Sequence, residues 1–124
     1  MILRFLLAVA FMLATSCYEP QRDCQAFKYG TFEFSALLNG KEVTTTFTRE
    51  GNLEIDYFQG KSDTSEVRWI NDCEYIVKKL HPKNISEEKS IHMKILSTAA
   101  NSYTFEYGIV GASVKSKGTA IKIK

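Results

Sequence analysis

The chain has 124 residues, of which 16 are lysine or arginine and 14 are aspartate or glutamate, so its formal net charge at pH 7 is only +2. This near balance excludes the concentrated basic field that displaces counterions from phosphates, and we expect no nucleic-acid partner. A chain of this size supports one hydrophobic core, which predicts a single domain.

The first sixteen residues have the layout of an export signal. Arg4 supplies one positive charge, an apolar run extends from Phe5 to Ala14, and small residues follow. This is the arrangement of a secretory signal peptide, because a run of about ten apolar residues is too short to cross a hydrocarbon core of ~30 Å as a helix. We therefore predict that residues 1–16 are a signal peptide.

The segment Ala14-Thr15-Ser16-Cys17 resembles a bacterial lipobox. The resemblance implies cleavage before Cys17, with acyl chains on its thiol and its new amine, and two or three such chains give a durable anchor. Residues 17–25 are then a lipidated tether, and the acyl chains of Cys17 bind the lipid bilayer. This predicts a cell-envelope protein at the outer membrane, facing the periplasm. The alternative is a secreted protein that is cut nearby, with Cys17 as a spare thiol.

The other two cysteines are then left as a pair. Three cysteines are an odd number, and assigning Cys17 to the anchor leaves Cys24 and Cys73. Because thiols oxidise outside the cytoplasm, we predict a disulfide between them. The alternative is two buried reduced cysteines that act as small apolar side chains.

From Phe27 onward, polar and apolar residues alternate with period two, and turn residues interrupt the alternation every eight to twelve positions. This pattern is typical of an all-β meander. The turn Asn39-Gly40 favours a type I′ hairpin, and a longer turn is expected at 59–63. The longest irregular stretch is 81–89, with one helical turn at 86–89. Strand segments are predicted at or within 27–38, 43–48, 53–57, 67–69, 73–80, 91–95, 103–109 and 121–123.

Eight short sequential strands remove their exposed edges best by curling together. We therefore predict that residues 26–124 form an all-β domain, an eight-stranded antiparallel up-and-down meander that closes into a lipocalin-like barrel or a strongly bent sheet. The interior of an eight-stranded barrel holds packed side chains or one small ligand. The alternation does not decide between a filled and a hollow interior.

The sequence contains little that indicates catalysis. His81 and His92 are the only histidines, and their spacing does not promise a metal site. No nucleophile is flanked by a pattern that suggests a base, and no glycine-rich loop cradles a phosphate. We expect no enzyme activity, no cofactor and no metal. The minority alternative is acid–base chemistry by four carboxylates around Arg68: Asp63, Glu66, Asp72 and Glu74. The more ordinary interpretation is that these carboxylates are solvated and that one forms an ion pair with Arg68.

The segment 68–75 is the densest in unusual residues. Trp69 and Tyr75 are candidates for the floor of a pocket, with Arg68 supplying charge to an anionic ligand. Phe105 and Tyr107, from the strongest aromatic stripe of the chain, complete the candidate ligand-binding set. The alternative is a core corner pinned by the predicted disulfide.

Three segments carry a resemblance to a known family: 27–32, 68–75 and 103–107. Together they look like a family of small, uncharacterised lipoproteins from Bacteroidota-type bacteria, and the likeness extends over the mature chain. Members carry the label "DNA topoisomerase IV", an activity for which a lipid-anchored β domain of this size lacks the DNA gate and the metal-binding acidic region. A more distant likeness to lipocalin-type barrels implies the fold only, since fold does not fix function.

Two functions compete. The first is a membrane-anchored, non-catalytic binding module for a small apolar or amphipathic ligand. The alternative is a protein-interaction or inhibitor module that inserts the loop 81–89 into an envelope enzyme or another partner protein.

Overall fold

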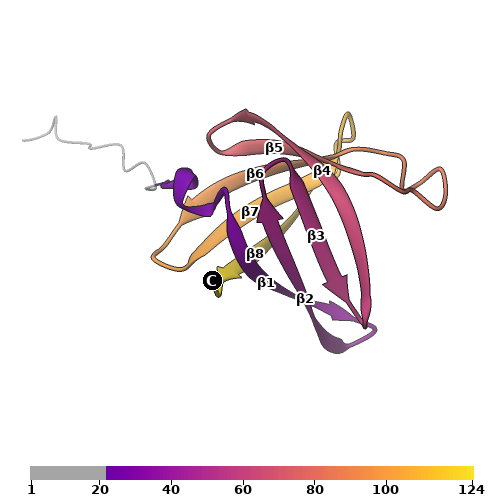
Figure 1. Cartoon of the computed structure of the whole chain (residues 1–124), viewed down its shortest axis with the longest axis horizontal. Coiled ribbons are helices and arrows are strands. Elements are labelled where there is room, and N and C mark those ends of the chain that lie inside the picture. Colours follow the sequence, from indigo (N-terminus) through magenta and orange to yellow (C-terminus); the bar gives the residue numbers. More distant parts are fainter. Residues whose placement is uncertain (1–21) are drawn as a thin grey trace, which may run out of the picture.

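The computed structural model describes residues 22–124, so the predicted signal peptide and Cys17 lie outside the described residues. One short 3₁₀ helix precedes eight strands in the described part (Figure 1). The elements are η1 (Cys24–Phe27), β1 (Gly30–Leu38), β2 (Lys41–Glu50), β3 (Leu53–Phe58), β4 (Lys61–Asn71), β5 (Glu74–Lys79), β6 (Ile91–Thr98), β7 (Ser102–Ile109) and β8 (Ser116–Lys122).

The strands form a closed barrel in sequence order. Each strand pairs antiparallel with the next, and β1 also pairs antiparallel with β8, where Phe34 lies opposite Ala120. In Figure 1 the first and last strands accordingly lie side by side, although they are at opposite ends of the colour scale. This confirms the predicted fold class and selects the barrel over the bent sheet. Closure leaves no unpaired sheet edge among the eight strands.

The tight turns follow from residues that tolerate positive φ angles. Asn39 and Gly40 have φ angles of 53° and 78°, which confirms the predicted type I′ geometry. Gln59 and Gly60 repeat this pattern with 48° and 76°. The second turn is shorter than predicted, because β4 begins at Lys61 and not after residue 63.

One end of the barrel is covered by η1, and we call it the closed end. The predicted first strand begins at Gly30 and not at Phe27, because Phe27 belongs to η1 and its buried ring packs against Tyr103 with centroids 5.3 Å apart. Gly30 has a φ of 133°, and a β-carbon there would lie 2.7 Å from the backbone oxygen of Lys124. Glycine is therefore needed at this position because two chain segments approach each other closely.

The predicted disulfide is confirmed and fastens η1 to the barrel. Cys24, the first residue of η1, is bonded to Cys73 in the turn between β4 and β5. The helix thus includes Cys24 and Gln25, two residues that we assigned to the tether. The crosslink therefore holds η1, which covers the closed end, against the β4–β5 turn.

The opposite end, the open end, carries the β1–β2 and β3–β4 turns and the longest connection. This connection, residues 80–90, is called the β5–β6 loop and projects beyond the strands in Figure 1. It confirms the predicted irregular stretch, and backbone hydrogen bonds from Glu88 to Ile85 (3.2 Å) and from Lys89 to Ser86 (3.4 Å) form its single turn.

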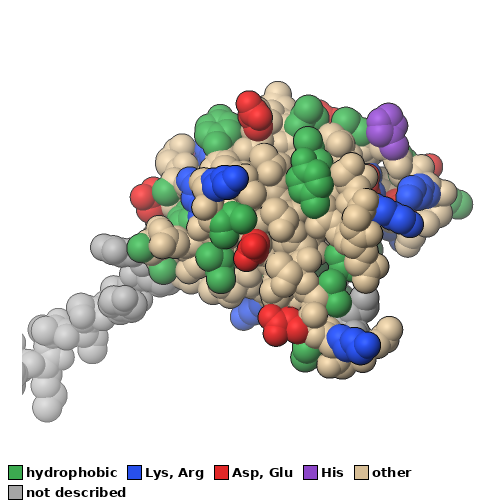
Figure 2. Space-filling model, turned by 60° about the horizontal axis from the view of Figure 1, so that its bottom comes forward, with side chains coloured by type: hydrophobic (Ala, Val, Ile, Leu, Met, Phe, Trp, Pro, Cys, Tyr) green, Lys and Arg blue, Asp and Glu red, His purple; other side chains and the backbone are tan. Residues whose placement is uncertain are grey.

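The outer surface mixes side chains of all kinds. In Figure 2, apolar groups are interspersed with acidic and basic ones over the face shown. Between residues 22 and 124 there is no helix whose length and hydropathy would let it span a membrane.

A cavity and a buried charge cluster inside the barrel

Strand β3 directs its acidic side chains into the barrel. Glu54 is 8% exposed and Asp56 is half-buried, whereas Leu53 and Tyr57 on the other face are 44% and 45% exposed. Apolar residues normally face the core, so this strand inverts the usual pattern. The inversion places two carboxyl groups in the interior.

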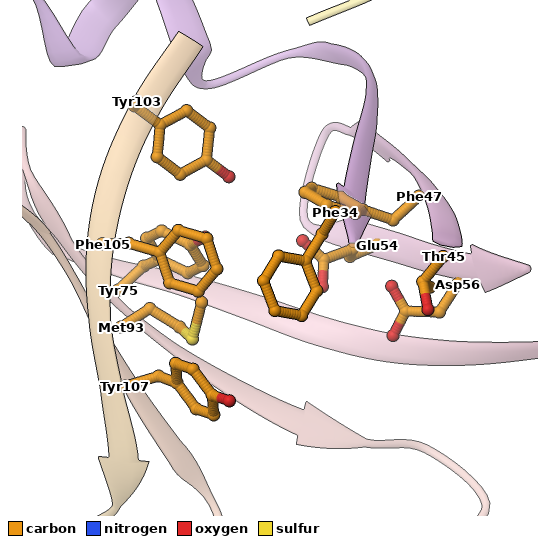
Figure 3. A pocket seen from close by; sticks show the side chains of 10 residues that line it. All are labelled: Phe34, Thr45, Phe47, Glu54, Asp56, Tyr75, Met93, Tyr103, Phe105 and Tyr107. Carbon is orange, nitrogen blue, oxygen red and sulfur yellow. The ribbon is translucent and has the colours of Figure 1, made fainter. Parts of the chain in front are cut away.

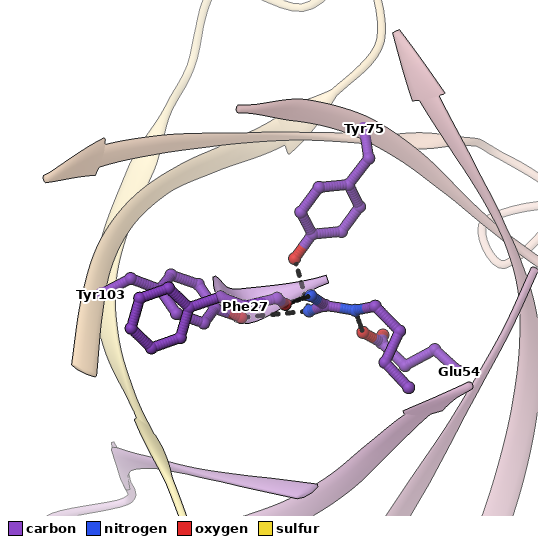
Figure 4. A network of polar contacts seen from close by, with 5 residues as sticks. Phe27, Glu54, Tyr75 and Tyr103 are labelled. Atoms are coloured by element: carbon purple, nitrogen blue, oxygen red, sulfur yellow. Dashed lines mark hydrogen bonds and ion pairs between the residues drawn. The ribbon is translucent and has the colours of Figure 1, made fainter. Parts of the chain in front are cut away.

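Arg49 of β2 partners the first of these carboxyl groups. It lies directly opposite Glu54 in the β2–β3 register, and its Nε donates to Glu54 Oε1 at 3.2 Å. Its terminal nitrogens donate to the backbone oxygen of Phe27 (2.6 Å) and to the phenolic oxygens of Tyr75 (2.9 Å) and Tyr103 (3.0 Å) (Figure 4). A buried charge requires such partners, and here four different elements supply them.

Aromatic rings enclose the same guanidinium group. Its central carbon lies 4.7 Å from the ring centroid of Tyr75 and 5.1 Å from that of Phe32, distances suited to cation–π attraction. Burial lowers the pKa of Arg49, but Tyr75, Tyr103 and Glu54 oppose this more strongly and raise it overall. Arg49 therefore stays charged at the closed end and fixes Glu54 beside it.

On the side of this cluster toward the open end lies a cavity of about 210 Å³ (Figure 3). In Figure 3, Tyr103, Phe105 and Tyr107 project from one side of the barrel, and Glu54 and Asp56 lie on the other. The ten lining residues are Phe34, Thr45, Phe47, Glu54, Asp56, Tyr75, Met93, Tyr103, Phe105 and Tyr107. The wall is thus mostly aromatic and carries its charge on one side.

Gly118 makes room for two of these rings. A β-carbon at Gly118 would lie 2.5 Å from Phe34 Cε2 and 2.8 Å from Phe105 Cζ. The two rings meet edge to face over the glycine, with centroids 5.5 Å apart. A side chain at this position would push them into the cavity.

A larger polar hollow of about 620 Å³, which we call the vestibule, lies at the open end. It shares Thr45 and Asp56 with the cavity, so these two residues stand at the junction. The β5–β6 loop contributes His81, Lys83 and Glu87 to its wall.

Lys79 ties this loop to the barrel rim. Its Nζ lies 2.9 Å from Asp63 Oδ2 and 2.8 Å from Glu87 Oε1. The hydrogen bond with Glu87, followed by that with Asp63, raises the pKa of Lys79, and its partner Glu87 has a lowered pKa for the same reason. The Nζ of Lys79 therefore has one acidic partner on the barrel rim and another in the β5–β6 loop.

The five residues predicted to bind a ligand lie in three places. Tyr75, Phe105 and Tyr107 line the cavity. Trp69 also faces inward, but it packs on Tyr75 with centroids 4.5 Å apart and does not line the cavity. Arg68 is exposed and borders an outer-surface depression with Ile76 and Lys78, so it brings no charge to the cavity.

The four carboxylates considered around Arg68 are dispersed. Asp63 binds Lys79 at the open end, while Asp72 lies 3.6 Å from Lys28 near the closed end. Glu66 borders the same outer depression as Arg68, and Glu74 lies 3.8 Å from His92. Across residues 22–124 there is no group of three or more histidine, cysteine, aspartate or glutamate side chains that could hold a metal ion.

Sequence reasoning missed Arg49, Glu54 and Asp56 because it treated charged residues as surface residues. One signal was present: Arg49 and Glu54 flank the turn 50–53 symmetrically, so a two-residue hairpin pairs them on one face. Comparison with protein-family models, with curated proteins and with solved structures finds no match to this chain. The cavity itself is therefore the basis for assigning a function.

Proposed function

We propose that this protein is a membrane-anchored lipoprotein of the bacterial envelope, and that its barrel is a non-catalytic binding module for a small amphipathic ligand. The observation that carries the proposal is the 210 Å³ cavity, whose aromatic wall meets a few polar groups on one side. Small-molecule sites typically combine an apolar, concave lining with a small number of placed polar groups. The vestibule supplies a route from solvent, because it shares Thr45 and Asp56 with the cavity.

The anchor part of the proposal rests on the lipobox resemblance of Cys17. The described chain enters the barrel at the closed end through η1, and the vestibule lies at the open end. Six residues separate Cys17 from Cys24, and they reach at most ~22 Å when extended. An acylated Cys17 would therefore hold the closed end near the bilayer, with the vestibule directed away from it.

The binding test uses a residue at the junction. Thr45→Trp adds a large side chain between the vestibule and the cavity, and Thr44→Trp adds the same side chain to the exposed face of the same strand. Benzyl alcohol, benzylamine and benzoate are titrated against each protein. The readout is the NMR signal of the Met93 methyl group, since Met93 lines the cavity.

We expect at least one of these compounds to shift the Met93 signal in the wild type and in Thr44→Trp, and none to do so in Thr45→Trp. A Met93 signal that no compound moves, or that responds equally in both variants, contradicts the binding proposal. The anchor is tested separately by mass spectrometry of the chain produced in a bacterium that acylates lipoproteins. A mature chain that starts elsewhere than at an acylated Cys17 contradicts the anchor.

A second candidate is a protein-interaction module, and one observation favours it. Ile85, in the β5–β6 loop, is 78% exposed, and the loop is held in place by the Lys79–Glu87 ion pair. An ordered loop with an apolar side chain suits insertion into a partner protein. For this candidate, Ile85→Asp should abolish crosslinking to an envelope protein, whereas Thr44→Trp should not; equal crosslinking by both variants contradicts it.

A further inference from the structure

The charges that line the cavity are all of one sign. Its two carboxyl groups are those of Glu54 and Asp56, and its lining contains no lysine, arginine or histidine. The interior cations lie beyond its wall: Arg49 is below it at the closed end, and Lys79 is above it in the vestibule. Whatever enters the cavity therefore meets carboxyl groups.

Glu54 presents one free oxygen to this space. Its Oε1 accepts the hydrogen bond from Arg49, and no hydrogen bond reaches its Oε2 among residues 22–124. In the same part of the chain, no fully buried side-chain nitrogen or oxygen lacks a hydrogen-bond partner. The Oε2 of this side chain, which is nine-tenths buried, is therefore not sealed off but faces the cavity that Glu54 lines.

The carboxyl group of Asp56 is the second acceptor, and it forms no ion pair or side-chain hydrogen bond within the described residues. Lys79, which lines the vestibule together with Asp56, is already held between Asp63 and Glu87. Burial, followed by the charges of Glu54 and Asp63, raises the pKa of Asp56 to about 7, against the smaller opposing effects of Lys79 and Arg49. The ionised carboxylate therefore lacks a cationic partner inside the barrel.

We propose that the cavity binds an organic ammonium ion, with its positive nitrogen between Asp56 and Glu54 and its apolar part among the rings of Phe105 and Tyr107. The inference rests on the proposed function and specifies its ligand class. A cation near two carboxylates gains Coulomb energy where water is partly excluded. The aromatic faces around it attract a cation further, which is how proteins bind quaternary ammonium groups.

Other ligand classes fit the lining less well. A fatty acid or another anion would bring its carboxylate against Glu54 and Asp56 without a lysine or arginine to receive it. A bare metal ion would need further oxygen or nitrogen ligands, and the described residues do not gather three. An uncharged apolar ligand would leave the ionised Asp56 without a partner, at a cost in free energy.

The test compares two probes of equal shape. Choline carries a permanent positive charge, and 3,3-dimethylbutan-1-ol has a carbon in place of its nitrogen. Both are titrated at pH 8, where Asp56 is mostly ionised, and dissociation constants are taken from the Met93 methyl shift. The variant is Asp56→Asn. The matched control is Glu66→Gln, which removes one negative charge from the outer surface.

We expect choline to bind the wild type at least tenfold more tightly than the alcohol. In Asp56→Asn the choline affinity should fall to about that of the alcohol, whereas Glu66→Gln should leave both affinities unchanged. The comparison of the two probes in the wild type holds even if a variant does not fold.

The outcomes separate the two proposals. If the alcohol binds as tightly as choline, and Thr45→Trp abolishes both, the cavity binds ligands but the ammonium inference is overturned. If neither choline nor the alcohol moves the Met93 signal, the ammonium inference is likewise overturned. The binding proposal fails as well if the three benzyl compounds are without effect, or if they act equally on Thr45→Trp and Thr44→Trp.

Discussion

Arg49 and Glu54 stand directly opposite each other on β2 and β3, and their side chains form an ion pair of 3.2 Å inside the barrel. The pair divides the interior into two parts. Toward the closed end, Arg49 gathers η1 and two tyrosines, and toward the open end Glu54 forms part of the cavity wall. One hairpin therefore serves both the stability of the closed end and the charge of the candidate site.

Loss of Arg49 should strongly destabilise the barrel. Arg49→Met removes the partner of Glu54 and leaves two buried phenols and the oxygen of Phe27 without their donor. Breaking a buried pair from one side typically costs about 3–5 kcal/mol of unfolding free energy. Urea unfolding of Arg49→Met measures this cost.

The control is Arg68→Met, an exposed arginine whose loss should change the unfolding free energy by less than about 0.5 kcal/mol. The double variant Arg49→Met with Glu54→Gln should recover part of the loss, because no charge is then left unpaired. Equal costs at positions 49 and 68 would mean that the buried network contributes nothing.

The pKa of Asp56 predicts an unusual dependence of stability on pH. The carboxyl group binds its proton more tightly in the folded chain, with a pKa of about 7, than at its ordinary value of 3.8, because burial and the neighbouring Glu54 disfavour the charge. The folded state is therefore favoured at low pH, and the free energy of unfolding should fall as pH rises from about 4 to about 7. The fall contributed by this group is at most about 4 kcal/mol.

Asp56→Asn should remove this fall. The variant should match the wild type near pH 4 and exceed it in unfolding free energy at pH 8, as measured by urea unfolding at pH 4.5, 6 and 8. Glu66→Gln is the control for the loss of one carboxylate and should follow the wild-type curve. If wild type and Asp56→Asn have parallel profiles, the carboxyl group of Asp56 titrates normally.

The position of Gly118 predicts a steric effect on the cavity. Gly118→Val places methyl groups where the rings of Phe34 and Phe105 now lie, so those rings should move into the cavity. Overpacking of this kind costs about 1–3 kcal/mol, and it should also weaken the binding of any compound that shifts the Met93 signal. Thr119→Val, on the exposed face of the same strand, should do neither. Unchanged binding in Gly118→Val would show that the rings yield without filling the cavity.

The disulfide between Cys24 and Cys73 predicts a loss of stability when the bond is removed. Replacing Cys24 and Cys73 with alanine together should lower the unfolding free energy by about 2–4 kcal/mol, since the bridge closes a loop between residues 49 positions apart. Reductant added to the wild type should produce the same change, and it should have no effect on the double variant. A reductant effect of equal size on the double variant would mean that the change does not come from the Cys24–Cys73 bond.

The barrel could be predicted from the sequence because its evidence is local. Asn39-Gly40 specifies a hairpin turn by its backbone preferences alone, and the alternation of Tyr103, Phe105 and Tyr107 directs three rings to one side of a strand. Up-and-down connection of eight such strands then leaves few alternatives to closure.

The candidate site was less predictable because it breaks the rule on which strand prediction depends. In β3 the predicted alternation of polar and apolar residues is present, but the acidic face points inward and Leu53 points outward. Only the ring of partners around Arg49 makes that inversion stable, and those partners come from positions 27 to 103 of the chain. The 3₁₀ helix at 24–27 is not encoded in a short repeating pattern, whereas the outward position of Arg68 follows the alternation, since it stands between the inward-facing Val67 and Trp69.

The bond between Cys24 and Cys73 also determines how the molecule would respond to mechanical force. Tension applied between the N-terminal side of η1 and the C-terminus would pass from Cys24 through the sulfur atoms to Cys73, bypassing the residues between them. Strands β1 to β4 lie within this bypassed segment, and their chain would not be extended until the bond is reduced. Stretching the oxidised protein should therefore release only the chain beyond residue 73, and reduction should lengthen the extension by up to ~170 Å.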